Sequence, residues 1–158
     1  MLIREGTEAD LPDAYRLIQE LAIFEKEPNA VVTSVETMKE DGFGAKPVFG
    51  FFVAESESKI VGLSLYYDRY STWRGRCLYL EDLIVNKNYR GQGIGKALLD
   101  RTIQKASDEG YQGMSWQVLD WNETAIDFYK RYKTNIDAGW LNCSLSKTQL
   151  ASTETTLK

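Results

Sequence analysis

The sequence predicts one mixed α/β (α+β) domain. Its 158 residues, of which 43% are hydrophobic and 27% charged, suit a single compact core rather than a pair of domains. Strand-type and helix-type patterns follow one another in the order β-α-α-β-β-β-α-β-α-β, without an internal repeat or a linker. Strands cluster early, and a helix directly follows a glycine-rich turn. This order is typical of a sheet flanked by helices.

The first third of the chain predicts a short strand and two helices. Residues 2–4 are β-prone, and Thr7 is the expected N-cap of the helix after them. Apolar residues recur at helical spacing in that helix: Leu11, Ala14, Tyr15, Ile18, Leu21 and Ala22. A second, shorter helix begins at Thr33 or Ser34 and ends near the turn at residues 41–44.

Three strands occupy the middle of the chain. Residues 49–55 and 60–67 are rich in β-branched and aromatic side chains, and the polar residues 56–59 between them predict a hairpin. Residues 76–85 form the third strand of this group.

The last third predicts two helices, two strands and a tail. After the glycine-rich turn at residues 86–95, one face of a helix is apolar (Ile94, Leu98, Leu99, Ile103 and Ala106), and Gly110 ends it. Strands are expected at residues 114–119 and 139–145, with a helix between them that Asn122 caps. The domain is expected to span residues 1–145, and residues 146–158, rich in Ser and Thr, to form a strand end or a flexible tail.

Composition excludes several functional classes. A net charge of -4 without a single-sign block argues against nucleic-acid binding, and no apolar run approaches the roughly 20 residues needed to cross a membrane. The chain has no His, which removes Ser-His and Cys-His nucleophiles and His-ligated metal sites, so no metal is expected. Cys77 and Cys143 lie far apart, which favours a reducing, cytoplasmic compartment over a disulfide framework.

The glycine-rich turn has the chemistry of an anion-binding loop. Its glycines allow close backbone approach, and the N-terminus of the following helix attracts phosphate. The motif comprises Arg90, Gly91, Gln92, Gly93, Ile94, Gly95 and Lys96. A plain flexible turn is the competing interpretation, whereas the spacing fits neither a Walker loop nor a dinucleotide fingerprint.

The turn resembles the acetyl-CoA loop of the GNAT superfamily of N-acetyltransferases, with the pattern [RQ]xxGx[GA]. Further motifs resemble the diamine (spermidine/spermine) and thialysine branch in matching order: DGFG (41–44), YSTWRGR (70–76), YLED (79–82), VLDWN (118–122) and FYKR (128–131). The resemblance implies a mixed, mostly antiparallel sheet of about six to seven strands with about four helices. It also implies a homodimer.

The resemblance implies transfer of an acetyl group from acetyl-CoA to a primary amine by direct attack. It assigns the role of general base, which takes a proton from the amine, to Glu81 of the YLED motif. It assigns the role of general acid, which protonates the departing thiolate, to Tyr129 of FYKR. Regular alternation would place Asp82 on the opposite face from Glu81, although a bulge near this point would redirect either side chain. Alternatively, Glu81 is a purely structural strand acid, and any one tyrosine usually serves packing.

Cofactor and acceptor residues follow from the same resemblance. The backbone of Leu83, Ile84 and Val85 would pair with pantetheine like an extra strand, the loop residues 90–96 would hold the pyrophosphate, and Asn122 and Ala125 would contact pantetheine. The residues implied around the acceptor are Phe24, Glu25, Ser71, Trp73, Glu81, Asp82 and Trp140.

The acceptor itself stays open. Polyamine enzymes usually have an acidic residue just before the Trp that matches Trp73, where this chain has Ser71 and Thr72. They usually have further acidic residues just before the later Gly-Trp pair, where this chain has Ala138. The pattern is therefore more similar to the thialysine type. The segment formed by residues 133–138 is a few residues shorter than the matching segment of either type of enzyme. A protein-lysine acetyltransferase and a catalytically weak acetyl-CoA sensor are the alternatives.

Overall fold

The computed structural model describes residues 1–153 and divides into two compact units, the first spanning Met1–Leu119 and the second beginning at Asp120. Residues 154–158, part of the expected tail, lie outside the described residues.

The first unit is built on a mixed five-stranded sheet in the order β1-β2-β3-β4-β5. Its strands are β1 (Leu2–Glu5), β2 (Gly50–Ser56), β3 (Lys59–Ser71), β4 (Gly75–Val85) and β5 (Met114–Ser115). The first four strands pair antiparallel, and β5 pairs parallel with β4. The predicted fold class is therefore confirmed, and so is the hairpin of residues 49–67.

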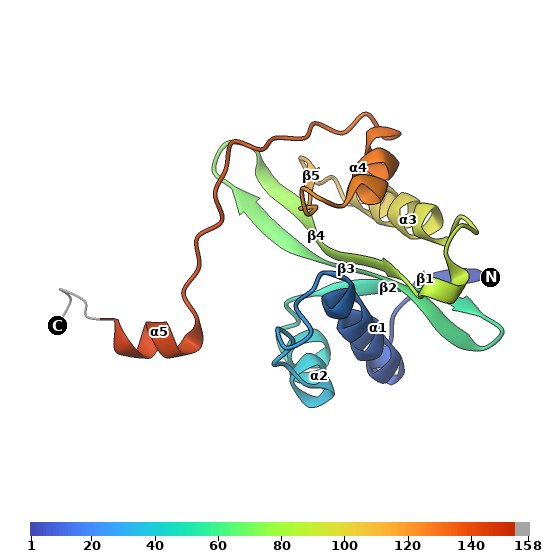
Figure 1. Cartoon of the computed structure of the whole chain (residues 1–158), viewed down its shortest axis with the longest axis horizontal. Coiled ribbons are helices and arrows are strands. Elements are labelled where there is room, and N and C mark those ends of the chain that lie inside the picture. Colours follow the sequence, from blue (N-terminus) through green and yellow to red (C-terminus); the bar gives the residue numbers. More distant parts are fainter. Residues whose placement is uncertain (154–158) are drawn as a thin grey trace. The chain divides into compact units, whose positions relative to one another are not determined.

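Helices cover both faces of this sheet (Figure 1). Helices α1 (Leu11–Phe24) and α2 (Val35–Phe43) lie on one face, and α3 (Ile94–Asp108) lies on the other. Short 3₁₀ turns, η1 (Glu8–Asp10) and η2 (Lys87–Tyr89), precede α1 and α3. Ser34 caps α2 by accepting a hydrogen bond from the Thr37 amide at 3.1 Å, and this selects Ser34 from the two caps that the sequence allowed.

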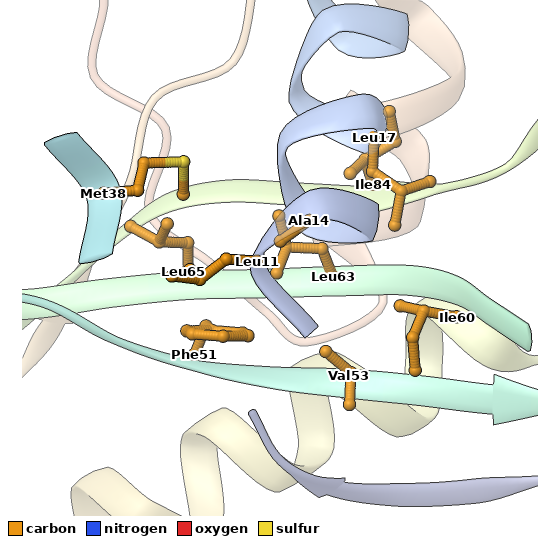
Figure 2. Packing of buried hydrophobic residues seen from close by; sticks show 10 residues of the cluster. All are labelled: Leu11, Ala14, Leu17, Met38, Phe51, Val53, Ile60, Leu63, Leu65 and Ile84. Carbon is orange, nitrogen blue, oxygen red and sulfur yellow. The ribbon is translucent and has the colours of Figure 1, made fainter. Parts of the chain in front are cut away.

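The face beneath α1 holds an apolar core. Leu11 and Ala14 of α1 lie near Leu65 and Leu63 of β3, and Leu17 lies beside Ile84 of β4 (Figure 2). All six side chains are buried. Burying one leucine stabilises the fold by about 1.5–3 kcal/mol, so this helix is held mainly by packing rather than by its own propensity.

An ion-pair cluster secures the entry into α1. Arg4 of β1 donates to both carboxylate oxygens of Asp10, at 2.7 and 2.8 Å, and to Glu55 of β2 at 2.9 Å. The same Asp10 carboxylate accepts from the backbone N–H and the hydroxyl of Thr7. Thr7 therefore caps the 3₁₀ turn η1, through a reciprocal capping interaction with Asp10, whereas Asp10 is the N-cap residue of α1 itself, so the expected N-cap lies one short turn before the helix.

A β-bulge interrupts β4. Tyr66 pairs with Leu80 while the preceding residue, Leu65, pairs with Asp82, so Glu81 is an extra residue without a partner in the ladder. Packing shows the resulting shift independently, because Ile84 joins the core beneath α1 while Leu83 packs against the core beneath α3.

The second unit contains α4 (Glu123–Lys130) and α5 (Lys147–Ser152). Asn122 caps α4 as predicted, its side-chain oxygen accepting from the Ala125 amide at 3.2 Å. The segment after Ser146, expected to be a strand end or a flexible tail, begins with the short helix α5.

Two expected strands need correction, and residues 1–153 hold five strands rather than six or seven, with five α-helices rather than four. The strand expected at 114–119 is limited to Met114–Ser115, the two residues that pair with β4. The strand expected at 139–145 is wrong. The Asp137 carboxylate accepts from the Gly139 amide and the Trp140 indole, and such local bonds compete with extended pairing.

Candidate functional site

The glycine-rich loop is open and leads into α3. Gly91 and Gly93 have φ values of 76° and 80°, and a Cβ at either position would meet nothing within 4 Å. Gly93 is the N-cap residue of α3 and has no side chain to cap the helix. The first backbone N–H groups of the helix therefore face a space without a Cβ, an arrangement suited to an anion.

The side chains at the rim of this loop have different surroundings. Ile94 is buried in the core beneath α3, so only its backbone is suited to a ligand. Lys96 forms an ion pair with Asp100 at 2.5 Å, while Gln92 is exposed. Arg90 donates to the Val85 carbonyl at 2.9 Å and thereby ties the loop to the end of β4.

The C-terminal half of β4 has one open edge. On one side β4 pairs with β3 as far as Val85, but on the other side, in the described part of the chain, β5 pairs with it only at Leu78 and Tyr79. The predicted cofactor-binding segment, residues 83–85, lies on this edge. Its side chains pack in the two cores, so its backbone is the part available to a ligand.

Three carboxylates gather on the α1 face of the sheet. Asp82 faces that side because it pairs with Leu65, and Glu81 faces it because it follows Tyr79, which pairs with Tyr67 two residues after Leu65. The bulge thus answers the question left open by the sequence, placing both acids on one face. Glu25, directly after α1, is the third acid, and its charge reaches Asp82.

Burial and like charge set the protonation of this cluster. Burial, together with the negative charges of Glu81 and Glu25, raises the pKa of Asp82 to about 6. Burial also raises the pKa of Glu25. Glu81 itself is exposed. A half-buried acid beside two like charges is favoured in its ionised form by a cation, so the cluster is suited to a positively charged ligand.

Two aromatic side chains that were not expected from the sequence border the carboxylates. Tyr67 and Tyr79 pair across β3 and β4 with ring centroids 5.2 Å apart, and the Arg69 guanidinium lies 5.5 Å from the Tyr79 ring centroid. Burial and the nearby negative charge of Glu81 raise the pKa of Tyr67 to about 12. Their place beside Glu81 depends on strand register, which residue types alone do not reveal.

The predicted acceptor residues of the first unit differ in surroundings. The Arg90 guanidinium lies 5.3 Å from the centroid of the Phe24 ring, and this contact joins the end of α1 to the glycine-rich loop. Ser71 is part of the β3–β4 turn, where its hydroxyl accepts from the amides of Trp73 and Arg74. Trp73 is 88% exposed at that turn.

The remaining predicted residues lie in the second unit. Asn122 and Ala125 are joined by the capping hydrogen bond of α4, while Tyr129 is the buried residue of that helix. Its neighbour Phe128 has its ring centroid 5.3 Å from that of Tyr129. The indole of Trp140 donates to Asp137 at 3.2 Å.

The described residues hold neither a metal-binding cluster nor a membrane-spanning helix. Among residues 1–153, no group of three or more His, Cys, Asp or Glu side chains is arranged to hold a metal ion. No helix in the same residues combines the length and apolar character needed to span a bilayer.

Sequence comparison links this geometry to known proteins. The profile of the acetyltransferase (GNAT) family matches residues 12–133. A thialysine N-epsilon-acetyltransferase of Bos taurus is 44% identical over 138 residues, covering 82% of this chain and 81% of that protein. A spermidine/spermine N(1)-acetyltransferase-like protein 1 of Homo sapiens is 37% identical over 134 residues, covering 80% of this chain and 19% of that protein.

The fold has close counterparts among solved structures. An aminoglycoside acetyltransferase from an uncultured soil metagenomic sample superposes with a TM-score of 0.76 at 27% identity. The match covers 92% of this chain and 95% of that one.

Proposed function

Since the chain belongs to the acetyltransferase (GNAT) family, we propose that it transfers the acetyl group of acetyl-CoA to a primary amine of a small molecule. The expected family and its diamine/thialysine branch are confirmed by the profile match and by both named relatives. The chain is thus an N-acetyltransferase. The proposed acceptors are thialysine-like amino acids and di- or polyamines.

The carboxylate cluster is the observation that supports an amine acceptor. An amine with a pKa near 10 reaches the protein as a cation, and Glu25, Glu81 and Asp82 place negative charge where such a cation would be attracted. Tyr67 and Tyr79 add an aromatic border for an alkyl chain. The cluster therefore favours a cationic acceptor over a neutral or an acidic one.

The residues around the glycine-rich loop fit acetyl-CoA. The open space at Gly91 and Gly93 and the N-terminus of α3 suit the pyrophosphate, and the free edge at residues 83–85 suits the amides of pantetheine. In the proposal, Asn122 and Ala125 contact pantetheine through α4. When bound, acetyl-CoA would supply the acetyl group as a thioester.

Two residues of the chain handle protons in this proposal. Glu81 takes a proton from the ammonium group, directly or through water, because only an unprotonated amine attacks a thioester. Tyr129 donates a proton from its hydroxyl to the departing sulfur, since a phenol is acidic enough to protonate a thiolate. Direct attack in a ternary complex requires no nucleophile of the enzyme, which agrees with a chain that has no His.

Further parts of the proposal concern assembly and location. Family resemblance favours a homodimer, and two unpaired cysteines favour the cytoplasm. A peptide-lysine acceptor is the main alternative, because it shares the chemistry and differs in pocket width. A weak acetyl-CoA sensor is the other alternative, which the retention of Glu81 and Tyr129 disfavours.

An acceptor panel tests the proposal. The protein is incubated with acetyl-CoA and thialysine, lysine, putrescine, spermidine or a lysine peptide, and products are identified by mass spectrometry. Acetylation of a free amine is the expected result, with calorimetric binding of acetyl-CoA as a parallel measurement. Tight binding without any acetylated amine would favour a sensor, whereas no binding would refute the proposal.

A Tyr129→Phe variant separates the proton donor from the rest of the site. Loss of the hydroxyl is expected to lower kcat about a hundredfold with little change in the affinity for acetyl-CoA, because general-acid catalysis contributes only in the transition state. An unchanged kcat would remove Tyr129 from this role.

A further inference from the structure

We propose that Tyr67 is a positioning residue for Glu81, holding its carboxylate on the α1 face of the sheet through the phenol hydroxyl. The inference rests on the proposed function, because it assigns Tyr67 a part in the acetyl transfer that Glu81 assists. It adds a residue of β3 to a site whose expected acids come from β4 and from the end of α1.

Strand register brings the two residues together. Tyr67 pairs with Tyr79, so Glu81 is the diagonal neighbour of Tyr67, two residues further along β4 on the same face. Diagonal neighbours lie about 7–8 Å apart, which is within reach of long side chains. The bulge leaves Glu81 without a ladder partner, so the backbone alone holds this residue less firmly than its neighbours.

Packing fixes the orientation of Tyr67. Its ring stands 5.2 Å from that of Tyr79, and the two planes are tilted by 35°. The Arg69 guanidinium lies 5.5 Å from the Tyr79 ring centroid, so Tyr79 has an aromatic neighbour and a cationic one. Since packing already restricts the side chain of this half-buried tyrosine, its hydroxyl can form a hydrogen bond with little further loss of side-chain entropy.

The electrostatic surroundings agree with a contact between the two groups. Burial is the largest cause that raises the pKa of Tyr67, followed by the negative charge of Glu81. The phenol therefore stays protonated at neutral pH and donates. The other charged or titratable groups around Glu81 are Arg69 on β3, Tyr79 and Asp82 on β4, and, through Asp82, Glu25 after α1.

An exposed carboxylate benefits from such a donor. Without it the Glu81 side chain would sample several rotamers, and like charge from Asp82 would push it away from the cluster. A hydrogen bond to a charged acceptor favours its ionised form, the form that accepts a proton from an ammonium group.

Tyr67→Phe is the test, with Tyr66→Phe as the matched control. Phenylalanine keeps the ring that packs on Tyr79, and Tyr66 is the adjacent residue on the opposite face, where its ring packs on Phe52. We expect Tyr67→Phe to lower kcat/KM about tenfold and to move the acid limb of its pH profile upward by about one unit. Affinity for acetyl-CoA stays unchanged, and the control keeps the wild-type profile.

A second measurement does not depend on activity. In protein labelled with ¹³Cζ-tyrosine, the Tyr67 signal is assigned by its absence from Tyr67→Phe. Glu81→Gln is expected to make this phenol ionise at a lower pH than in the wild type, because the neighbouring charge is removed.

The outcomes distinguish the two proposals. An unaltered Tyr67 titration in Glu81→Gln, or an active Tyr67→Phe variant with the wild-type pH profile, would overturn the positioning role. A wild-type protein that acetylates no amine while the titration still shifts would instead overturn the proposed function and retain the contact.

Discussion

The two acid clusters of the first unit have opposite electrostatic environments. At the start of α1, Asp10 meets the Arg4 guanidinium through two hydrogen bonds, and this interaction holds the pKa of Asp10 well below its usual range. On the same face of the sheet, Asp82 is also largely enclosed but is influenced by two acids, so its pKa rises to about 6. One cluster is neutralised within the fold, and the other is not.

This difference separates a structural role from a functional one. A carboxylate already satisfied by arginine gains little from a ligand, whereas a half-buried acid among like charges gains from any cation that binds beside it. Similar residue types therefore serve different purposes according to the sign of their neighbours. Substitutions in the two clusters should separate stability from activity.

The largest expected effect is that of Glu81→Gln on catalysis. Removing the base is expected to lower kcat/KM about a hundredfold near pH 7 and to shift its pH dependence toward conditions with more free amine. Because Glu81 is exposed, the free energy of unfolding of the variant, measured in urea, should stay within about 0.5 kcal/mol of the wild-type value. A variant that is fully active but unstable would place Glu81 with the structural cluster.

Asp10→Ala is expected to produce the converse result. Loss of this carboxylate leaves Arg4 and Thr7 without their shared partner, at a cost of about 3 kcal/mol in the free energy of unfolding. Urea denaturation measures this change. The activity per folded molecule, measured well below the unfolding midpoint, should equal that of the wild type, and a specific loss of activity would break the comparison.

A pH series of unfolding experiments sharpens the contrast. The pKa of Asp82 is raised from 3.8 to about 6, so the folded state binds this proton more tightly than the unfolded chain does. Its contribution to stability therefore falls as pH rises from about 4 to about 6, by about 2 kcal/mol after allowance for partial exposure. Asp10 acts in the opposite sense, because its lowered pKa gives stability that is lost as pH falls below about 4.

Asp82→Asn isolates the first of these effects. The difference in unfolding free energy between wild type and variant should change by about 2 kcal/mol between pH 4 and pH 7, with the variant gaining at the higher pH. A constant difference across this range would mean that Asp82 does not titrate there.

The smallest expected effect concerns the glycines of the loop. Gly93→Ala introduces a side chain at a φ of 80° and should cost about 1 kcal/mol in stability. Gly95 has an ordinary φ, and a Cβ there would lie 3.7 Å from Val85, so Gly95→Ala should leave the fold intact. Calorimetry of acetyl-CoA binding, combined with thermal unfolding, then shows whether Gly95 serves the ligand. Wild-type affinity in Gly95→Ala would assign it to structure alone.

Local patterns predicted much of this fold because they depend on neighbouring residues. The helix at Leu11–Phe24, a cap at Thr33 or Ser34, the Asn122 cap and the glycine-rich loop before α3 all follow from spacing and residue type. The strand expected at 139–145 failed because strand formation depends on a partner, and apolar residues do not supply one. Likewise, the place of Tyr67 beside Glu81 depends on pairing between β3 and β4.

For the site, the sequence supplied candidate residues but not their geometry. Glu81 and Asp82 were both expected from resemblance, but their common orientation depends on a register shift between Leu65 and Tyr66. The roles assigned to these residues, and to Tyr129, stay predictions until the variants are measured.

The extra residue in β4 means that this acidic pair is encoded by chain length as well as by residue identity. Deleting Glu81 alone would bring Asp82 into an unbroken alternation, leave Leu83 and Ile84 in their present cores, and retain a single acid on this side. Such a deletion would disturb few apolar contacts while halving the charge that the strand presents. An evolving sequence can thus change its preference for multiply charged molecules by a one-codon loss, without rebuilding the interior.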